Sequence, residues 1–138
     1  MPALLAGILA AALCVWGARR LGVQRWAYTL GLLTLPWPYV FFAHRAGDGN
    51  TAFMEMYYGM FFLAAGLVFA ISRMKFSAYV VALLWLLHGA YDVFHSHLVF
   101  NLGTPGWYPL LCAGFDVVIA VSLVWLATRL PDGDILKA

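Results

Sequence analysis

Residues 78–99 read AYVVALLWLLHGAYDVFHSHLV, and this stretch decides the fold class. A helix over these residues, rising about 1.5 Å per residue, is long enough to cross the roughly 30 Å hydrocarbon core of a bilayer. Asp92 is its only acidic residue, and it contains neither lysine nor arginine. Because unpaired backbone groups are costly in lipid, a membrane-spanning stretch of this kind is helical. We therefore predict a transmembrane helix over residues 78–99.

Four other apolar stretches resemble it in length and composition, at residues 3–18, 26–44, 52–71 and 109–128. The whole chain of 138 residues is 64% hydrophobic and only 10% charged, with a mean hydropathy of +0.86. A soluble domain is about one quarter charged, so this composition indicates lipid as the solvent. The sequence therefore predicts an all-α integral membrane protein, a compact bundle of five transmembrane helices.

The domain organisation is expected to be simple. Residues 1–130 form one transmembrane domain, and residues 131–138 form a polar cytoplasmic tail. Pro36 and Pro38 are expected to kink the second span, because proline lacks the amide hydrogen that the helix requires. The first apolar stretch is followed, not preceded, by arginines, so it is expected to be a membrane helix and not a signal peptide.

The basic residues predict the orientation in the membrane. Seven of the eight fall in the first and third connections or at the C-terminal end, which lie on one face, whereas Arg45 lies on the other face. Cytoplasmic loops are enriched in lysine and arginine. We therefore predict an N-terminus outside and a C-terminus inside. The seven residues are Arg19, Arg20, Arg25, Arg73, Lys75, Arg129 and Lys137.

All four histidines and four of the six acidic residues fall in the extracytoplasmic half, and five of these eight lie inside the predicted helices away from the membrane surface: Glu55, His88, Asp92, His95 and Asp116. His88, Asp92 and His95 stand at positions i, i+4 and i+7, so they share one face of their helix. An aspartate near the bilayer centre costs on the order of 2.5–3.5 kcal/mol on insertion scales. We therefore expect these side chains to meet one another in a single site.

Imidazole and carboxylate groups are ligands that Zn²⁺ and Fe²⁺ accept. We predict that His88, Asp92 and His95 bind a divalent metal, with Glu55 and Asp116 as further ligands or as the catalytic general base and orienting group. Five candidate ligands exceed the four of a tetrahedral zinc, so a second ion is an option. Haem is not expected, because an apolar haem pocket does not need this surplus of carboxylates.

The favoured function is a metalloenzyme, a hydrolase or an oxidoreductase, that acts on a lipid-like or amphipathic substrate at the extracytoplasmic side. Three alternatives stay open: a metal-ion or proton transporter or channel, a metal-free acid–base isomerase of a lipophilic substrate, and a structural network of hydrogen bonds. The apolar cytoplasmic half counts against transport. Membrane lipids and a hydrophobic small molecule are the expected partners. The net charge of +2 argues against nucleic acid, and the oligomeric state is open, a homo-oligomer included.

Other polar and aromatic side chains have simpler interpretations. His44 and His97 lie near the predicted membrane surface and are expected to be solvated, and Asp48 is expected to be a turn residue. Tyr39 is one of several aromatic residues near the span ends that are expected to form the interfacial belt. Two tyrosines are candidates to hydrogen-bond into the site, Tyr58 and Tyr91.

The pattern WLLHxxxDVxH over residues 85–95, followed by CAxxDxxIA over residues 112–120, resembles a family of small bacterial integral membrane proteins of unknown function. Glu55 matches a glutamate of that family. The chain departs from the family pattern at His95 and Ser96, where the family has two adjacent histidines. The resemblance covers about residues 55–120. It implies a polar motif within a membrane bundle and supplies no activity.

Overall fold

The computed structural model describes residues 1–71 and 77–129, and every regular element in this part of the chain is a helix. The predicted polar tail and the third connection, with Arg73, Lys75 and Lys137, lie outside the described residues. The helices are α1 (Pro2–Leu21), α2 (Gln24–Leu32), α3 (Pro36–Arg45), α4 (Gly49–Ile71), α5 (Ser77–Leu98) and α6 (Tyr108–Arg129).

Four of these helices, α1, α4, α5 and α6, are long and apolar enough to cross a membrane. They coincide with four of the five predicted spans, and their ends differ from the predicted ends by only a few residues. The all-helical, membrane-like character of the chain is thus confirmed. Its orientation in the membrane stays a prediction.

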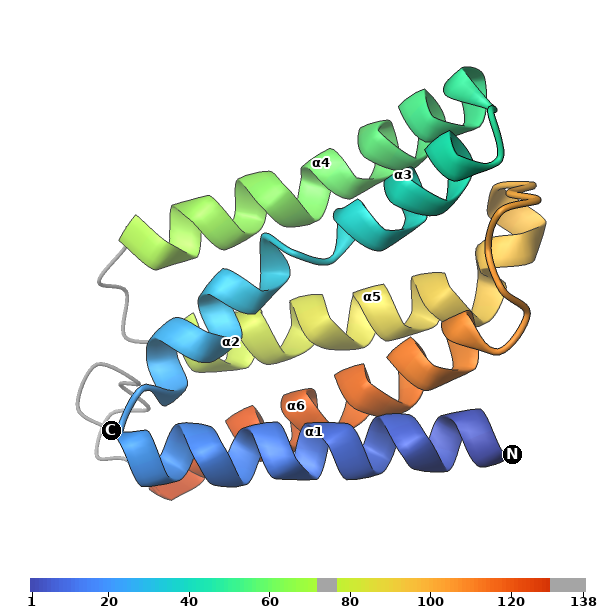
Figure 1. Cartoon of the computed structure of the whole chain (residues 1–138). Helices are drawn as coiled ribbons and strands as arrows, with labels where there is room; N and C mark the ends of the chain where they lie inside the picture. Colours follow the sequence, from blue (N-terminus) through green and yellow to red (C-terminus); the bar gives the residue numbers. More distant parts are fainter. Residues whose placement is uncertain (72–76, 130–138) are drawn as a thin grey trace.

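The predicted second span is broken into α2 and α3, not merely kinked. The two helices have 9 and 10 residues, so each alone covers only about 15 Å at 1.5 Å per residue. The break arises because Pro36 offers no amide hydrogen and its ring would collide with the carbonyl group one turn earlier. In Figure 1 the two helices follow one another along α4. A fifth crossing made by this broken pair stays a prediction.

The break leaves backbone carbonyl groups that a continuous helix would satisfy. The Thr34 hydroxyl donates to the Gly31 carbonyl oxygen at 2.7 Å, and the Trp37 indole nitrogen donates to the Leu33 carbonyl oxygen at 2.9 Å. Backbone groups inside a bilayer have no water to bind, so a helix break there needs such side-chain donors. The Gly31 carbonyl oxygen also accepts the Thr34 amide at 3.0 Å, so at the break Thr34 bonds to it through both its backbone and its side chain.

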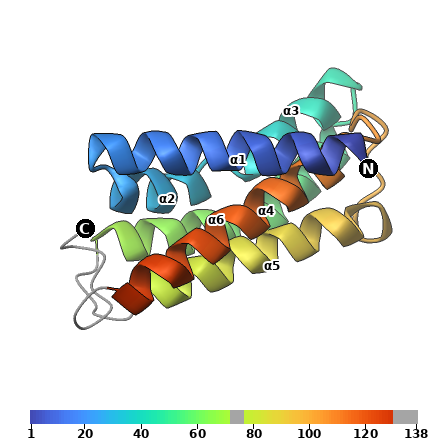
Figure 2. The same cartoon turned by 90° about the horizontal axis from the view of Figure 1, so that it is seen from below.

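The helices form two packed groups. Helix α6 packs against α1 and α5, and α4 packs against α2 and α3, whereas fewer contacts join the two groups (Figures 1 and 2). The N-terminus, the α3–α4 turn and the loop between α5 and α6 lie at one end of the bundle. This arrangement brings His44, Glu55 and His95 toward the same end, as the alternation of spans predicts. We call it the site end.

The apolar core fills the other half of the bundle. Its buried members come from α1, α2, α5 and α6, and none of them is charged. They are Ala11, Val15, Ala18, Tyr28, Leu32, Val81, Ala82, Leu84, Trp85, Ile119, Ala120 and Leu123. The polar and apolar halves predicted from the sequence are therefore both present in the fold.

Helices α1 and α6 approach each other so closely that only glycine fits at their crossing. A Cβ atom at Gly7 would collide with the backbone carbonyl oxygen of Leu111, and one at Gly114 would lie 2.6 Å from that of Leu4. Neither obstacle is a flexible side chain, so the helices themselves would have to separate. Small residues at such crossings are the usual means by which membrane helices pack.

We expect Gly7→Ala to lower the free energy of unfolding by about 1–3 kcal/mol, as overpacking of a close contact generally does. Gly17→Ala is the matched control, because a Cβ atom at Gly17 of the same helix meets nothing within 4 Å. That control is expected to be neutral or slightly stabilising, by about 0.5 kcal/mol. Thermal unfolding in detergent measures both, and equal effects of the two variants would contradict the close-crossing explanation.

Candidate functional site

The five residues predicted to form the site are all buried, with exposed fractions between 1% and 3%. Helix α5 carries His88, Asp92 and His95, while Glu55 comes from α4 and Asp116 from α6. The two helix groups therefore meet through these side chains. Gly89 permits the approach of α6, because a Cβ atom there would lie 3.2 Å from the Cβ atom of Asp116.

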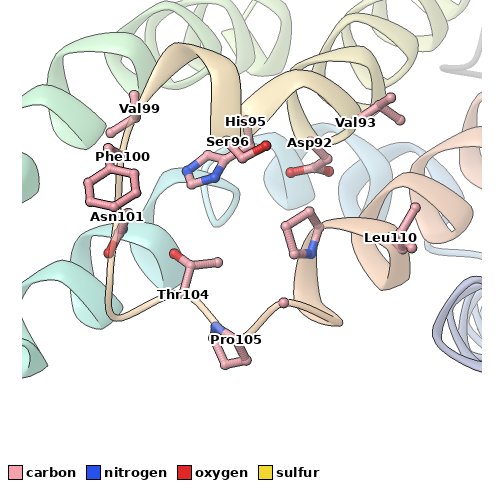
Figure 3. Close-up of a pocket in the computed structure, with 12 residues that line it drawn as sticks. Asp92, Val93, His95, Ser96, Val99, Phe100, Asn101, Thr104, Pro105 and Leu110 are labelled. Atoms are coloured by element: carbon pink, nitrogen blue, oxygen red, sulfur yellow. The ribbon is translucent and has the colours of Figure 1, made fainter.

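A pocket of about 400 Å³ opens beside these residues at the site end. It lies between the last turns of α5, the following loop and the first turn of α6, and both Asp92 and His95 line it (Figure 3). Its other polar lining groups include Asn101 and Thr104, and the Thr104 hydroxyl is buried without a hydrogen-bond partner. Most of the remaining wall is apolar: Val93, Val99, Phe100, Pro105, Pro109 and Leu110.

The first of two polar clusters consists of His88, Asp92 and Asp116. His88 Nδ1 lies 2.7 Å from Asp116 Oδ2 and 3.3 Å from Asp92 Oδ2. One ligand atom from each of the three residues lies within 4.8 Å of the others. An imidazole nitrogen placed between two carboxylates either carries a proton or ligates a cation. This buried group could therefore hold a metal ion, and it also forms ion pairs when it holds none.

One oxygen of this cluster has no hydrogen-bond partner. Asp92 Oδ1 accepts a hydrogen bond from the Tyr39 hydroxyl at 2.7 Å, whereas Asp92 Oδ2 is buried and accepts none. His88 Nδ1 lies closer to Asp116 Oδ2 than to Asp92 Oδ2, so a proton on this nitrogen would bond to Asp116 and leave Asp92 Oδ2 only the longer contact. A buried carboxylate oxygen without a donor is costly and indicates an additional binding partner such as a cation.

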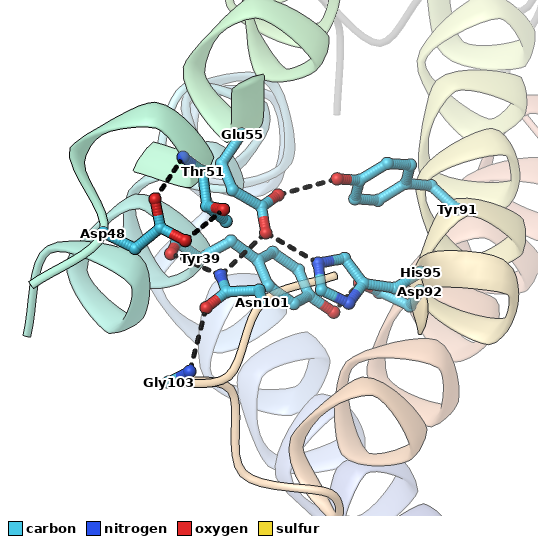
Figure 4. Close-up of polar contacts among 9 residues, drawn as sticks. All are labelled: Tyr39, Asp48, Thr51, Glu55, Tyr91, Asp92, His95, Asn101 and Gly103. Carbon is cyan, nitrogen blue, oxygen red and sulfur yellow. Dashed lines mark hydrogen bonds and ion pairs between the residues drawn. The ribbon is translucent and has the colours of Figure 1, made fainter. Parts of the chain in front are cut away.

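The second cluster surrounds Glu55, whose carboxylate accepts three hydrogen bonds (Figure 4). His95 Nε2 lies 2.8 Å from Oε1, the Asn101 amide nitrogen donates to the same oxygen at 2.7 Å, and the Tyr91 hydroxyl donates to Oε2 at 2.7 Å. The hydrogen bond expected from Tyr91 is thereby confirmed. The structure thus pairs Glu55 with His95 and leaves both outside the three-residue group that could hold a metal.

Tyr39 connects the two clusters. Its hydroxyl donates to Asp92, and its ring stacks on the His95 imidazole with centroids 4.0 Å apart and planes 20° apart. The side chain is only 2% exposed. The expectation that Tyr39 belongs to an interfacial belt is therefore wrong. A new helix, α3, begins at Pro36 after the break. The helical periodicity of residues 26–32 therefore does not predict which side of α3 a residue such as Tyr39 occupies.

Asn101 is the other member of the site that sequence reasoning missed. It lies in the loop that follows α5, where polar residues are usually solvated. Its amide nitrogen donates both to Glu55 and, at 3.1 Å, to the backbone oxygen of Tyr39, and its side-chain oxygen accepts from the Gly103 amide. Its position six residues after His95 is the only sequence signal that places it near the site.

The residues set aside at the sequence level lie away from both clusters. The side chains of His44 and His97 are exposed. Asp48 precedes α4 and accepts hydrogen bonds from the Thr51 amide at 2.9 Å and the Thr51 hydroxyl at 2.7 Å. These two donors lower the pKa of the Asp48 carboxyl below its ordinary value. Its expected role as a turn residue is confirmed, and its particular function is to cap α4.

Comparison with protein-family models, with curated proteins and with solved structures finds no match to this chain. The resemblance to a family of small membrane proteins thus stays a prediction carried by the quoted motif. Any statement about function rests on the geometry of the two clusters and the pocket.

Proposed function

We propose that the chain is a membrane metalloenzyme that binds a divalent cation, Zn²⁺ or Fe²⁺, between His88, Asp92 and Asp116. The observation that carries the proposal is the buried Oδ2 atom of Asp92, which lacks a hydrogen-bond donor within a group of three potential ligands. A cation at this point supplies the missing partner. When bound, it would contribute Lewis-acid activation of water or of a substrate oxygen.

Charge balance also favours a divalent cation. Two carboxylates and a neutral imidazole together carry two negative charges, which one divalent ion neutralises. Buried charge is tolerated when it is compensated within the cluster. Three protein ligands are also the number found in catalytic zinc sites, which keep one position open for water or substrate. The donor set suits zinc and iron equally well, so the proposal covers both metals.

The pocket supports an amphipathic substrate. Asp92 belongs both to the ligand group and to the pocket wall, so a cation on Asp92 would lie beside a molecule in the pocket. The polar groups of Asn101 and Thr104 would receive the polar end of that molecule, and the apolar wall its hydrocarbon part. Such a molecule would reach the pocket from the membrane or from its surface.

His95 is the proposed general acid or base. It lines the pocket, and Glu55 fixes its Nε2 atom by the 2.8 Å contact. A carboxylate that holds a histidine in one orientation and one tautomer is the arrangement by which imidazoles are prepared for proton transfer. Glu55 then acts through His95 as a positioning residue. Asp116, paired with His88, serves in this proposal as a ligand instead of a base.

The proposed location is the plasma membrane of a bacterium, with the pocket facing the exterior. The resemblance to small bacterial membrane proteins supports the location. The basic residues support the orientation, because Arg19 and Arg20 lie in the last turn of α1 and Arg129 lies in the last turn of α6, whereas the pocket lies at the first turn of α6. Hydrolysis and oxygen chemistry both fit a site of this kind, and the proposal includes either.

Metal content measured by elemental analysis tests the proposal. Protein purified from metal-replete cells is expected to carry about one equivalent of zinc or iron per chain, and His88→Ala about 0.2 equivalents or less, because the binding energy of such sites comes from the ligands. His97→Ala is the matched control, since His97 is an exposed histidine of the same helix. Wild-type protein without metal, or equal loss in both variants, would overturn the proposal.

A metal-free acid–base enzyme, such as an isomerase of a lipophilic substrate, is the second candidate. The specific observation in its favour is that each buried imidazole already lies within 2.8 Å of a carboxylate, so both clusters hold together without a cation. Strong chelators distinguish the two candidates. Under this second proposal they leave the melting temperature unchanged, whereas under the first they lower it.

Transport of metal ions or protons is less well supported. The half of the bundle beyond His88 is filled by the apolar core, with fully buried residues such as Leu32, Val81 and Leu123. A transport path through this half would need polar groups or water in place of these side chains.

A further inference from the structure

A second hollow lies along α6, at the end of the bundle opposite the site. It has a volume of about 390 Å³, and its wall is mostly apolar. The lining residues are Arg19 of α1 and Val117, Val118, Val121, Ser122 and Trp125 of α6. Because α1 and α6 are both membrane-crossing candidates, a hollow along α6 would face the lipid and follow the direction of an acyl chain.

Two arginines stack on the Trp125 ring, which lines this groove toward the bundle end, and one of them, Arg19, lines the groove itself. The guanidinium carbon of Arg19 lies 4.2 Å from the centroid of the Trp125 ring, and that of Arg129 lies 4.1 Å from the same centroid. A guanidinium group stacked on an indole face keeps its N–H groups free at its edge. Within residues 1–71 and 77–129, no carboxylate forms an ion pair with either arginine. The N–H groups of both arginines are thus not occupied by a carboxylate of these described residues.

An apolar strip leads away from the two arginines. Val117, Val121 and Trp125 stand four residues apart on one face of α6, and their exposed fractions are 47%, 62% and 41%. Arginine binds phosphate through paired N–H groups, and basic pockets between membrane helices on the positive side bind anionic head groups. The geometry joins an anion site to a hydrocarbon surface at one place.

We propose that this groove binds an anionic phospholipid. The phosphate accepts N–H groups at the edges of the Arg19 and Arg129 guanidinium groups, beside the Trp125 ring on which both stack. One acyl chain lies along the valine strip of α6. Free phosphate would leave the strip unused, and a neutral lipid would leave the net charge of the two arginines uncompensated. The proposal is independent of the metal site, because no residue is shared between them.

The experiment compares binding of phosphatidylglycerol and phosphatidylcholine to the delipidated full-length protein in detergent, by native mass spectrometry. The wild type is expected to prefer phosphatidylglycerol. At about fivefold in affinity per arginine, the double variant Arg19→Gln/Arg129→Gln should bind phosphatidylglycerol about 25-fold more weakly. Arg20→Gln is the matched control, because Arg20 stacks on Trp16 at 5.5 Å and not on Trp125 of the groove. It is expected to stay within about twofold of the wild type.

Further variants and a competitor separate the lipid from simpler explanations. Val121→Trp fills the strip without changing the charge, and it should weaken phosphatidylglycerol binding while circular dichroism shows an intact bundle. Inorganic phosphate at equal concentration should not displace the lipid. If Arg20→Gln and the double variant lost the same affinity for phosphatidylglycerol, general surface charge would explain the binding. That result would overturn the proposal. So would displacement by inorganic phosphate, or undiminished binding to Val121→Trp.

Discussion

Asp92→Asn is expected to remove the metal-dependent part of the thermal stability and to leave the metal-free protein at least as stable as the wild type. In the metal-free cluster two carboxyl groups face one imidazole, and the Oδ2 atom of Asp92 has no donor. Asparagine keeps an oxygen that accepts the Tyr39 hydroxyl, and it removes the carboxylate charge that His88 does not balance. The pair between His88 and Asp116, at 2.7 Å, then remains balanced.

The size of the metal-dependent part follows from linkage. With free zinc at about 100 times its dissociation constant, the wild type gains about 2.7 kcal/mol, whereas a variant that binds about a hundredfold more weakly gains about 0.4 kcal/mol. A hundredfold loss of metal affinity is a conservative expectation for removal of a ligand. Even the residues that only hydrogen-bond to metal ligands lower the metal affinity 10–100-fold when they are removed.

Melting curves with zinc and with a chelator measure both quantities. Asp48→Asn is the matched control, because Asp48 caps α4 outside the cluster and its replacement should leave the zinc-induced shift unchanged. Two results would count against the metal site: a full zinc-induced shift in Asp92→Asn, or a metal-free variant that unfolds several degrees below the wild type.

Glu55→Ala should be the most destabilising single truncation at the site. It leaves the His95 ring nitrogen, the Tyr91 hydroxyl and the Asn101 amide without their acceptor. Breaking a buried charged pair costs about 3–5 kcal/mol, because the remaining groups stay buried and unpaired. For a chain of this length, the melting temperature should fall by on the order of 10 °C. Since Glu55 lies between the two helix groups, the loss should also separate them.

Two companion variants make the result specific. Glu55→Gln keeps the shape and an acceptor oxygen, so we expect it to lose clearly less stability than Glu55→Ala. Met54→Ala removes an exposed neighbour on the same helix and should be close to neutral. Thermal unfolding measures all three, and a Glu55→Ala variant as stable as Met54→Ala would show that the hydrogen bonds around Glu55 contribute little.

Much of the fold could be predicted because lipid imposes strict requirements on length and polarity. The long apolar stretches become α1, α4, α5 and α6, and the same-face spacing of His88 and Asp92 reappears as a contact of 3.3 Å. Periodicity gives the direction of a side chain on its own helix but not the distance between two helices. The separation of Glu55 and His95 from the three-residue cluster was therefore beyond sequence reasoning.

Two other features depended on local backbone geometry. Tyr39 reaches the site because α3 starts anew at Pro36, and helical periodicity cannot be carried across such a break. Asn101 reaches it because the short loop after α5 folds back, which packs Gly103 against the Phe42 carbonyl group. Both are contacts between segments far apart in the chain, and neither has a periodic signal.

The position of Glu55 has a consequence for the synthesis of the protein. Its donors follow late in the chain, with Tyr91 36 residues and Asn101 46 residues further on. At about 5–20 residues per second, a ribosome needs a few seconds to produce them. During that interval α4 carries a carboxyl group whose partners do not yet exist. If α4 crosses a membrane, its insertion is therefore least favourable before α5 and its loop have emerged to supply these partners.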